Sequence, residues 1–435
     1  MNKNNLITVF DPDDLKTMYD FNYYVKAYTG ATSSQVNTIY LLFFKYLIDF
    51  KVGINTKESE KLLLEIKKSL NENLDQELLK QYLHLILFEY DEIINFSGIV
   101  YNILNDIGLG NQKLWKKFND FKINNIDLLI YFIDELLIST NSINISSIVN
   151  KSIVDLCLSI SNIKENDICY NPMCGTANFL TNINKNCYLY GDDVNINELS
   201  IAFIKKIIMG KDIDFRFEDC YLSYMAKKNF ADVVFIQPLF CSINDNCKLI
   251  YKDYPTLLPS KAVDVSSILL VINSLKENGI GFLHIPIGFL FRNMKDAAIV
   301  KKFLLEKNYL DAVIEFKNIC NGTGVSTALL ILKKNKKDGN IIFVNASKYC
   351  IKSFNRYIIP NDAISNIVDI INKKKKINGF SAVCESKEIL KNNDDYNFIT
   401  NRFIKYNPIF DYRNISNIDK DIDNVWKLIK ENMEH

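Results

Sequence analysis

Short apolar runs alternate with turns of small and polar residues between positions 167 and 240, and this pattern predicts a mostly parallel β-sheet. Four apolar runs are each followed by such a turn, and the turns are Asn171 to Ala177, Asp192-Asp193, Glu218-Asp219 and Gln237 to Phe240. Successive strand-then-turn units are typical of strands joined by helical crossovers. Ligands bind such sheets at the carboxyl ends of the strands, so we expect these polar residues at the binding edge.

The flanking stretches have the spacing of amphipathic helices instead. One stripe consists of Val36, Ile39, Tyr40, Phe43 and Leu47, and a second consists of Ile418, Ile422, Val425, Trp426 and Ile429. We therefore expect a helical N-terminal domain at 1–140, an α/β domain at 141–350 and a helical C-terminal tail at 351–435.

The second half of the α/β domain continues the alternation of helices and strands. The expected elements are a helix from Val265 to Leu275 that stops at Asn278-Gly279, a strand from Ile280 to Ile285, a helix from Lys295 to Leu305, and a hairpin of Leu310 to Phe316 and Thr327 to Lys333. His284 lies in the expected buried strand, and we assign it to the core.

The first of the four turns is the most informative about chemistry. Gly175, followed by the small residues Thr176 and Ala177, lets the backbone turn closely around a ligand just before a helix. Such a turn can cradle a nucleotide, although an isolated one often only joins a strand to a helix. An acid about 20 residues beyond the glycine can hold ribose hydroxyls, which strengthens the nucleotide hypothesis. We choose Asp193 for this role and expect Asp192 to face solvent.

Composition and charge limit the function classes. The 435 residues, 48% of them hydrophobic, suffice for two or three domains with large cores. The 52 basic and 51 acidic residues give a net charge of +1, which provides no electrostatic argument for a nucleic-acid partner. Ten cysteines without a paired Cys-x-x-Cys spacing indicate reduced core thiols, and three dispersed histidines argue against a metal site. Without a signal peptide or a span-length apolar stretch, we expect a soluble cytoplasmic protein with no membrane contact.

Four motifs in order resemble the S-adenosylmethionine (SAM) fold of adenine-N6 DNA methyltransferases, and most of all the modification subunit of type I restriction-modification systems. The family's Asp-Pro-x-Cys-Gly-Thr-Gly-Gly-Phe-Leu is matched by Asn171 to Leu180, and its Gly-x-Glu-x-Asn by Gly191 to Asn195. Its Gly-Asp-Ser-Leu is matched in part by Glu218 to Leu222, and its catalytic Asn-Pro-Pro-Phe by Gln237 to Phe240.

The resemblance implies a Rossmann-like domain with a mostly parallel seven-stranded sheet that binds SAM and DNA. The residues that it assigns to the cofactor are Asn171, Cys174, Gly175, Thr176, Asp193 and Asp219. Asp193 would hold the ribose and Asp219 the adenine amino group. Gln237 and Pro238 would orient the target amine, and Phe240 would stack on the flipped base. This chemistry requires no metal.

Several residues depart from the family's motifs. Gln237 keeps the amide of the catalytic asparagine but adds a methylene, which displaces the carbonyl by about 1.5 Å, and a misplacement near 1 Å can cost on the order of 100-fold in rate. Leu239 removes a proline and the φ angle that it fixes. Asn171 replaces an acid, while Ala177 and Asn178 replace glycines. These changes predict a weakened or lost activity.

The resemblance extends beyond the four motifs. The family phrase Gly-x-x-x-x-Val-Leu-Pro-x-Gly-x-Leu-Phe is matched at Pro286, Gly288 and Leu290-Phe291, and Gly-Thr-Gly-x-x-Thr is matched from Gly322 to Thr327. The Phe/Tyr-Thr-Pro phrase usual upstream is absent from 144–149. Residues 321–324 are interpreted as a hairpin turn or a DNA-facing loop, and the lysine runs 333–337 and 373–376 as solvated surface or phosphate contacts.

The expected partners follow from the resemblance. The chain shows no target-recognition domain of its own, so a separate specificity subunit is implied, with a second methyltransferase or a restriction subunit as a further partner. The terminal helix would dock on the specificity subunit or pack on its own domain. Three functions remain open: an impaired SAM-dependent N6-adenine DNA methyltransferase, a non-catalytic scaffold or DNA-binding subunit, and methylation of another planar amine, in a protein glutamine or RNA adenine.

Overall fold

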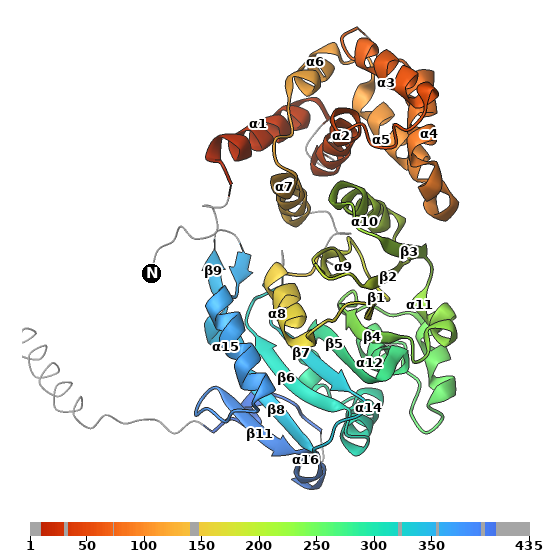
Figure 1. Ribbon diagram of the computed structural model, residues 1–435. Coiled ribbons are helices and arrows are strands. Elements are labelled where there is room, and N and C mark those ends of the chain that lie inside the picture. The colour runs from red at the N-terminus through yellow and green to blue at the C-terminus, as the bar shows by residue number, and fades with distance from the viewer. Residues whose placement is uncertain are drawn as a thin grey trace, which may run out of the picture.

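The computed structural model describes residues 10–29, 34–72, 74–139, 148–320, 324–353, 356–392 and 396–405. The N-terminal region is helical and packs above an α/β region that contains one large sheet (Figure 1). Its helices are α1 (Pro12–Thr29), α2 (Ser34–Asp49), α3 (Lys57–Ser69), α4 (Gln76–Ile94), α5 (Phe96–Gly108), α6 (Gln112–Asp120) and α7 (Ile126–Ser139). Side chains of Thr56, Asp75 and Asn111 accept N–H groups at the starts of α3, α4 and α6, as N-caps do.

Helix α2 forms the centre of the N-terminal region. The predicted stripe is confirmed, since Ile39, Tyr40, Phe43 and Leu47 are buried. Leu41 and other residues between them are buried too, because α1, α5 and α7 contact α2 from several sides. The helix is therefore enclosed rather than amphipathic.

The α/β region is built on a nine-stranded sheet with the order β11-β8-β6-β7-β5-β4-β1-β2-β3. The strands are β1 (Ile168–Asn171), β2 (Tyr188–Asp193), β3 (Ile213–Phe217), β4 (Ala231–Ile236), β5 (Leu275–Pro286), β6 (Leu310–Phe316), β7 (Thr327–Lys333), β8 (Asn340–Asn345) and β11 (Ser381–Glu385). Strands β1 to β5 are parallel, and β7 runs antiparallel between β5 and β6. The predicted mostly parallel sheet and its hairpin are confirmed. Strands β8 and β11 extend the seven that were expected.

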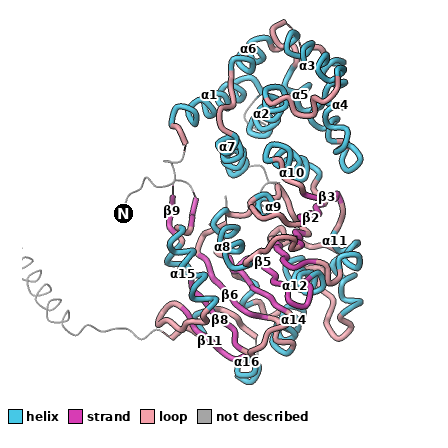
Figure 2. Tube along the Cα trace, viewed as in Figure 1, coloured by secondary structure: helices cyan, strands magenta, loops and turns pink. Residues whose placement is uncertain are grey.

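Helices cover both faces of this sheet (Figure 2). The helices of the α/β region are α8 (Lys151–Ser161), α9 (Asn178–Thr181), α10 (Ile196–Met209), α11 (Cys220–Ser223), α12 (Val263–Ser274), α13 (Gly288–Phe291), α14 (Lys295–Glu306), α15 (Asn361–Asn372) and α16 (Ser386–Asn392). Helices α8, α10 and α15 contribute to one apolar core, which continues into the N-terminal helices, and α12 and α14 contribute to a second core. The turns of 3-10 helix η1 (Tyr224–Lys227), η2 (Asp245–Asp253), η3 (Ala346–Tyr349) and η4 (Thr400–Arg402) connect these elements, with a small hairpin of β9 (Ile351–Ser353) and β10 (Arg356–Ile358).

The predicted helix stop at Asn278-Gly279 is wrong. Helix α12 ends at Ser274, and β5 begins at the next residue, so Gly279 lies inside the strand. Close packing explains the glycines of this strand, because a Cβ on Gly281 would lie 2.2 Å from the Val271 side chain of α12. Gly281 therefore permits α12 to approach the strand, while a Cβ on Gly279 would lie 2.9 Å from the backbone oxygen of Asp232 in β4.

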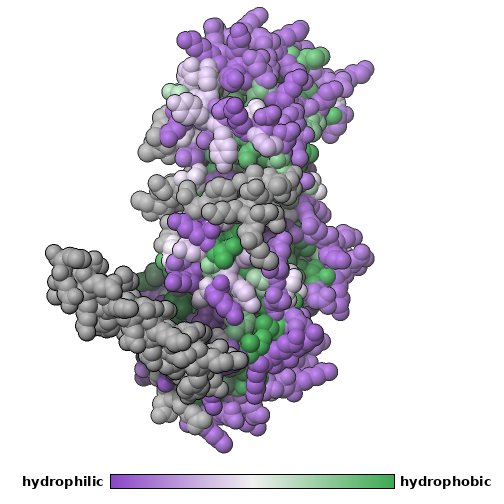
Figure 3. All heavy atoms as spheres, turned by 90° about the vertical axis from the view of Figure 1, so that its left-hand side faces the viewer, coloured by the Kyte–Doolittle hydropathy of each residue, from purple (hydrophilic) through white to green (hydrophobic). Residues whose placement is uncertain are grey.

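Residues beyond position 350 take part in the sheet. Strand β11 pairs antiparallel with β8, and α15 contacts α8. The predicted terminal helix at 418–429 lies outside the described residues, as do 321–323 and most of 144–149. The face shown in Figure 3 is mostly hydrophilic, with hydrophobic residues in scattered groups. None of the described helices is both long enough and apolar enough to cross a membrane.

Candidate functional site

The loop after β1 turns back against the end of β2. Cys174 donates its backbone N–H to the carbonyl oxygen of Asp192 over 2.9 Å, and Gly175 donates to a carboxylate oxygen of Asp193 over 2.7 Å. Gly175 adopts a left-handed φ of 53°, which glycine accepts without strain. Ala177 also has a left-handed φ, of 61°, where its Cβ is strained. The loop therefore keeps the shape of a glycine turn although one of its residues is alanine.

Asp193 holds this loop in place. Its two carboxylate oxygens accept N–H groups of Gly175 and Asn195, at 2.7 and 2.8 Å. Burial raises the pKa of Asp193, and the backbone N–H groups oppose this rise. Each carboxylate oxygen has a second lone pair, so Asp193 can accept a ligand hydroxyl as well. The residue predicted to hold the ribose thus lies at the end of β2 and already has a structural role.

Asp192 is fully buried, so the expectation that it faces solvent is wrong. Successive side chains in a strand point to opposite faces, which turns Asp192 away from the loop that Asp193 holds. Its Oδ2 accepts the hydroxyl of Tyr170, while its Oδ1 has no hydrogen-bond partner among the described residues. Burial raises the pKa of Asp192 to about 6, and Tyr170 and the Lys227 ammonium oppose the rise.

The other residues of the first motif are engaged within the fold. Asn171 is buried and accepts the backbone N–H of Met173 over 3.3 Å. The Thr176 hydroxyl donates to the side-chain oxygen of Asn178 over 3.3 Å, and the buried ammonium of Lys205 donates to the same oxygen. Asn178 therefore has a structural partner in α10, which the sequence motif did not indicate.

Asp219 accepts hydrogen bonds at both carboxylate oxygens. Its Oδ1 accepts the backbone N–H of Tyr221 over 2.9 Å, as the N-cap of α11. Its Oδ2 accepts the side-chain amides of Asn244 and Asn246, at 3.1 and 2.8 Å. Because a carboxylate offers about four acceptor positions, little capacity remains for an adenine amino group in this arrangement. The two asparagines come from the segment after β4, and no local pattern pointed to them.

Gln237 follows β4 directly, and its side chain is buried against β5. Ile236 pairs with Leu283, which places Gln237 beside His284 of the neighbouring strand. The Oε1 atom of Gln237 lies 2.6 Å from Nδ1 of His284, and Nε2 of His284 lies 2.7 Å from the hydroxyl oxygen of Thr327. His284 is buried, as predicted, but its contact with Gln237 was missed because the two residues lie on different strands.

The rest of the fourth motif reaches the surface. Pro238 is buried, whereas Leu239, which replaces the second proline of the family motif, is 56% exposed. Phe240 is half-buried, and its ring stands edge-on to His284 with 6.1 Å between the ring centroids. Phe240 therefore offers part of an aromatic face at the edge where β4 ends.

The predicted cofactor residues fit SAM in part. The left-handed turn at Gly175 and the carboxylate of Asp193 would suit the amino-acid and ribose parts of the cofactor, which supplies the methyl group when it is bound. Asp219 does not fit the adenine end in this conformation, because Asn244 and Asn246 occupy its carboxylate. We find no group of three or more His, Cys, Asp and Glu residues in the described ranges that could hold a metal ion.

Two cavities lie away from these strand ends. The larger, of about 440 Å³, is lined by residues of α4 and of the end of α10, and the smaller, of about 220 Å³, by residues that include Lys228, Tyr254 and Lys334. Neither is lined by a residue of the four motifs. The strand ends remain the better candidate because the motif residues meet there.

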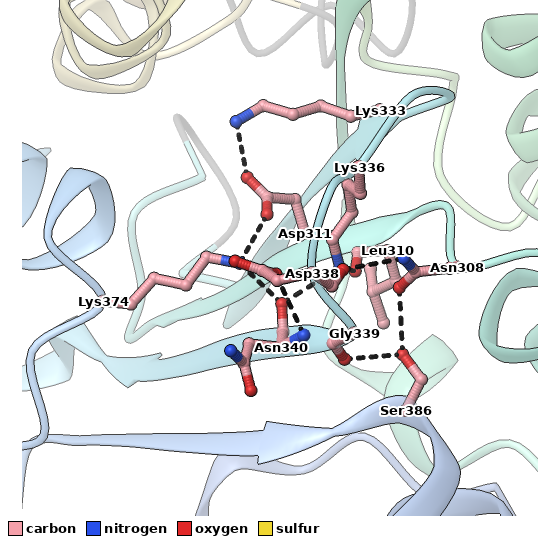
Figure 4. Close-up of polar contacts among 10 residues, drawn as sticks. All are labelled: Asn308, Leu310, Asp311, Lys333, Lys336, Asp338, Gly339, Asn340, Lys374 and Ser386. Atoms are coloured by element: carbon pink, nitrogen blue, oxygen red, sulfur yellow. Dashed lines mark hydrogen bonds and ion pairs between the residues drawn. The ribbon is translucent and has the colours of Figure 1, made fainter.

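Lysines of the two runs lie together around Asp311 and Asp338 (Figure 4), beside the first residues of β6 and β8. The buried Asp311 forms ion pairs with Lys333 at 2.7 Å and with Lys374 at 3.0 Å. Lys374 also pairs with Asp338 at 3.1 Å, and Lys336 donates to backbone carbonyl oxygens. These lysines join β6, β7, β8 and the end of α15, so their charges are used inside the fold.

Comparisons with known proteins agree with this fold. The family model described as N-6 DNA Methylase matches residues 149–411, more than half of the chain. The type I restriction enzyme MpnII methylase subunit of Mycoplasma pneumoniae is 31% identical over 147 residues, covering 33% of this chain and 27% of that protein. The MjaVII methylase subunit of Methanocaldococcus jannaschii is 24% identical over 288 residues, covering 58% of this chain and 48% of that protein. The chain thus spans about half or less of the curated relatives that it matches.

A solved structure supports the fold over a longer stretch. The methyltransferase subunit of a type I restriction-modification system from Streptococcus thermophilus superposes with a TM-score of 0.73. It is 17% identical and covers 90% of this chain and 99% of its own. The resemblance to type I modification subunits is therefore confirmed at the level of motifs and fold. From the four motifs, the strand order and the extent of the family match, we conclude that the chain belongs to the N-6 DNA methylase family.

Proposed function

We propose that this chain is the methyltransferase-like subunit of a type I restriction-modification system and that its N6-adenine DNA methylation, which uses SAM, is catalytically impaired. It would act in the cytoplasm on DNA together with a specificity subunit. A second methyltransferase or a restriction subunit would complete the assembly. The proposed impairment rests on one observation: the side-chain carbonyl oxygen of Gln237 lies 2.6 Å from Nδ1 of His284.

The cofactor part of the proposal rests on the loop after β1. The residues that would hold SAM are Asn171, Cys174, Gly175, Thr176, Asp193 and Asp219. Gly175 keeps the left-handed turn of the motif, and Asp193 keeps an acid at the end of β2. Asp219 would join them only after its amide partners move.

The catalytic part of the proposal rests on Gln237, Pro238 and Phe240. An amine approaching SAM needs an acceptor at a fixed place, and positioning dominates the rate of such a transfer. The side chain of Gln237 is one methylene longer than that of asparagine, and its carbonyl oxygen is already hydrogen-bonded to His284. Phe240 retains a face for stacking on a base. We therefore expect slow methylation at best.

The first experiment is SAM binding to the full chain, measured by calorimetry. Wild type is compared with Asp193→Ala and with Asp214→Ala, an exposed acid on the adjacent strand β3. Micromolar binding that is lost only in Asp193→Ala supports the cofactor site, provided that this variant keeps a cooperative melting transition. Absence of binding at millimolar SAM, from folded protein, rejects SAM use by the isolated chain.

A non-catalytic scaffold or DNA-binding subunit is the second candidate, and the engaged carboxylate of Asp219 favours it. The discriminating variant combines Gln237→Asn with Leu239→Pro, which restores the family motif. Transfer of labelled methyl groups to DNA, assayed with the partner subunits present, would support the impaired enzyme if it rises in this variant. No transfer from a folded, SAM-binding variant, with or without His284→Val added, would favour the scaffold.

A further inference from the structure

We propose that His284, backed by Thr327, is the positioning residue for the side-chain amide of Gln237, and that Gln237 and His284 form a coupled pair. This inference deepens the proposed function, since it concerns the residue at the catalytic position. The longer side chain of Gln237 brings its carbonyl oxygen within 2.6 Å of Nδ1 of His284. The departure from asparagine is then half of a paired change and not an isolated loss.

The contacts define the direction of both hydrogen bonds. Oε1 of Gln237 is a carbonyl oxygen and only accepts, so Nδ1 of His284, 2.6 Å away, carries the proton and donates it. Nε2 of the neutral ring then accepts the hydroxyl proton of Thr327 over 2.7 Å. Gln237, His284 and Thr327 are all buried. Burial lowers the pKa of His284 to about 3, which keeps the ring neutral.

The surroundings fix the ring of His284 between two aromatic side chains. Phe240 and Phe316 both stand edge-on to the imidazole, with centroids 6.1 and 6.4 Å away. An asparagine at position 237 would be shorter by one methylene, about 1.5 Å, and would fall out of hydrogen-bond range.

The sequence phrase around β5 supports the pairing. Aligned on Pro286, the phrase Val-Leu-Pro places its valine at position 284, where this chain has His284. A valine has no side-chain N–H and leaves the neighbouring amide for other partners. Here the donor of His284 takes one of the two lone pairs of the Gln237 carbonyl, the atom that would accept the target amine. Replacing Gln237 alone therefore leaves the Nδ1–H of His284 without its acceptor.

Nitrogen-15 NMR of the full chain labelled in histidine tests the geometry. The chain has three histidines, His84, His284 and His435, so His284→Val assigns the resonances of interest by their loss. We expect His284 to be a neutral ring protonated at Nδ1 and to stay neutral from about pH 5 to about pH 9. A ring protonated at Nε2, or one that titrates near its ordinary pKa of about 6.5, would overturn the assignment.

A double-variant cycle tests the coupling. Melting temperatures are measured for Gln237→Asn, His284→Val and the two combined. Each single change should lower the melting temperature by roughly 2–4 °C, because it removes the buried hydrogen bond between Gln237 and His284. The combined variant should lose clearly less than the sum, since both single changes remove the same hydrogen bond between Gln237 and His284. Strict additivity would overturn the pairing.

In a control cycle, Gln237→Asn is combined with His84→Val instead of His284→Val. His84 is an exposed histidine of α4 that pairs with Asp91 at 3.1 Å. Additivity is expected there because the residues share no contact.

Methyl transfer is then assayed in the variants of Gln237 and His284 with Leu239→Pro present. Transfer is compared at a temperature where every variant is fully folded. Higher transfer when Gln237→Asn and His284→Val are combined than with Gln237→Asn alone then supports a positioning role, because a difference in stability cannot produce it. If the melting temperatures are non-additive but no variant transfers methyl groups, the pairing of Gln237 with His284 is supported and the hypothesis of an impaired enzyme is not.

Discussion

The ammonium of Lys205 lies 2.9 Å from a carboxylate oxygen of Asp134 and joins α10 of the α/β region to α7 of the N-terminal region. The side chain of Lys205 is fully buried, and its ammonium also donates to Asn178 in the loop after β1. One buried cation therefore connects three segments. Asn178 stands where the family motif has glycine, so this departure has acquired a structural role.

We expect Lys205→Met to destabilise the chain by about 2–3 kcal/mol, because breaking a buried ion pair leaves partners without their cation and Asp134 is only partly able to regain water. The free energy of unfolding from urea titration measures the loss. Lys151→Met, which removes an exposed pair with Asp155, is the control and should cost less than about 0.5 kcal/mol. If the free energy of unfolding fell equally in the two variants, the buried ion pair would contribute no more to stability than the exposed one.

Ala177→Gly should stabilise the chain by about 0.5–1 kcal/mol, because the left-handed φ of 61° is strained for alanine and free for glycine. Gly175→Ala is the matched reverse change, at a φ of 53°, and should destabilise by a similar amount. Melting temperatures of the two variants should shift in opposite directions. If both variants had lower melting temperatures than wild type, packing around the loop would outweigh backbone strain.

The buried Asp192 predicts a pH dependence of stability. Its folded-state pKa of about 6 exceeds the unfolded value of about 3.9, so the folded chain binds more protons in this interval. Its contribution is most favourable below about pH 4 and is lost as the pH rises to about 6. Asp192→Asn should therefore stabilise the chain at about pH 8 by on the order of 2 kcal/mol and change little at about pH 4.

The measurement is the melting temperature of wild type and Asp192→Asn at both pH values. Asp214→Asn on β3 is the control, because that carboxyl is exposed and its ion pair is with Arg216, across 3.4 Å. A gain for Asp192→Asn that is the same under the acidic and the alkaline condition would refute the titration as its cause.

Removing the amides that occupy Asp219 should favour cofactor binding. In the variant that combines Asn244→Ala and Asn246→Ala, Oδ2 of Asp219 loses both donors and regains acceptor capacity. We expect the SAM dissociation constant, measured by calorimetry, to fall several-fold, on the order of 1 kcal/mol in binding free energy. An unchanged constant would mean that Asp219 does not contact the adenine end.

Local patterns in the sequence were sufficient for several strands of the α/β region. The apolar runs before Asn171 and Gln237 are β1 and β4, and the strand expected at 280–285 lies within β5. The helix stop at Gly279 was wrong because a glycine that permits close packing has the same sequence pattern as one that ends a helix. Asp192 was misplaced because adjacent residues of a strand point to opposite faces, and the face that Asp192 occupies is buried in the fold.

The sequence by itself determined the family, the mostly parallel sheet and the strand ends where the polar residues of the four motifs lie, since periodicity and turn chemistry are properties of neighbouring residues. Only the tertiary structure decided what those residues contact. His284 meets Gln237 across 47 positions of the chain, and Lys205 meets Asn178 across 27. The strand order and the helix packing create these contacts, and the unfavourable burial of an unpaired polar group maintains them.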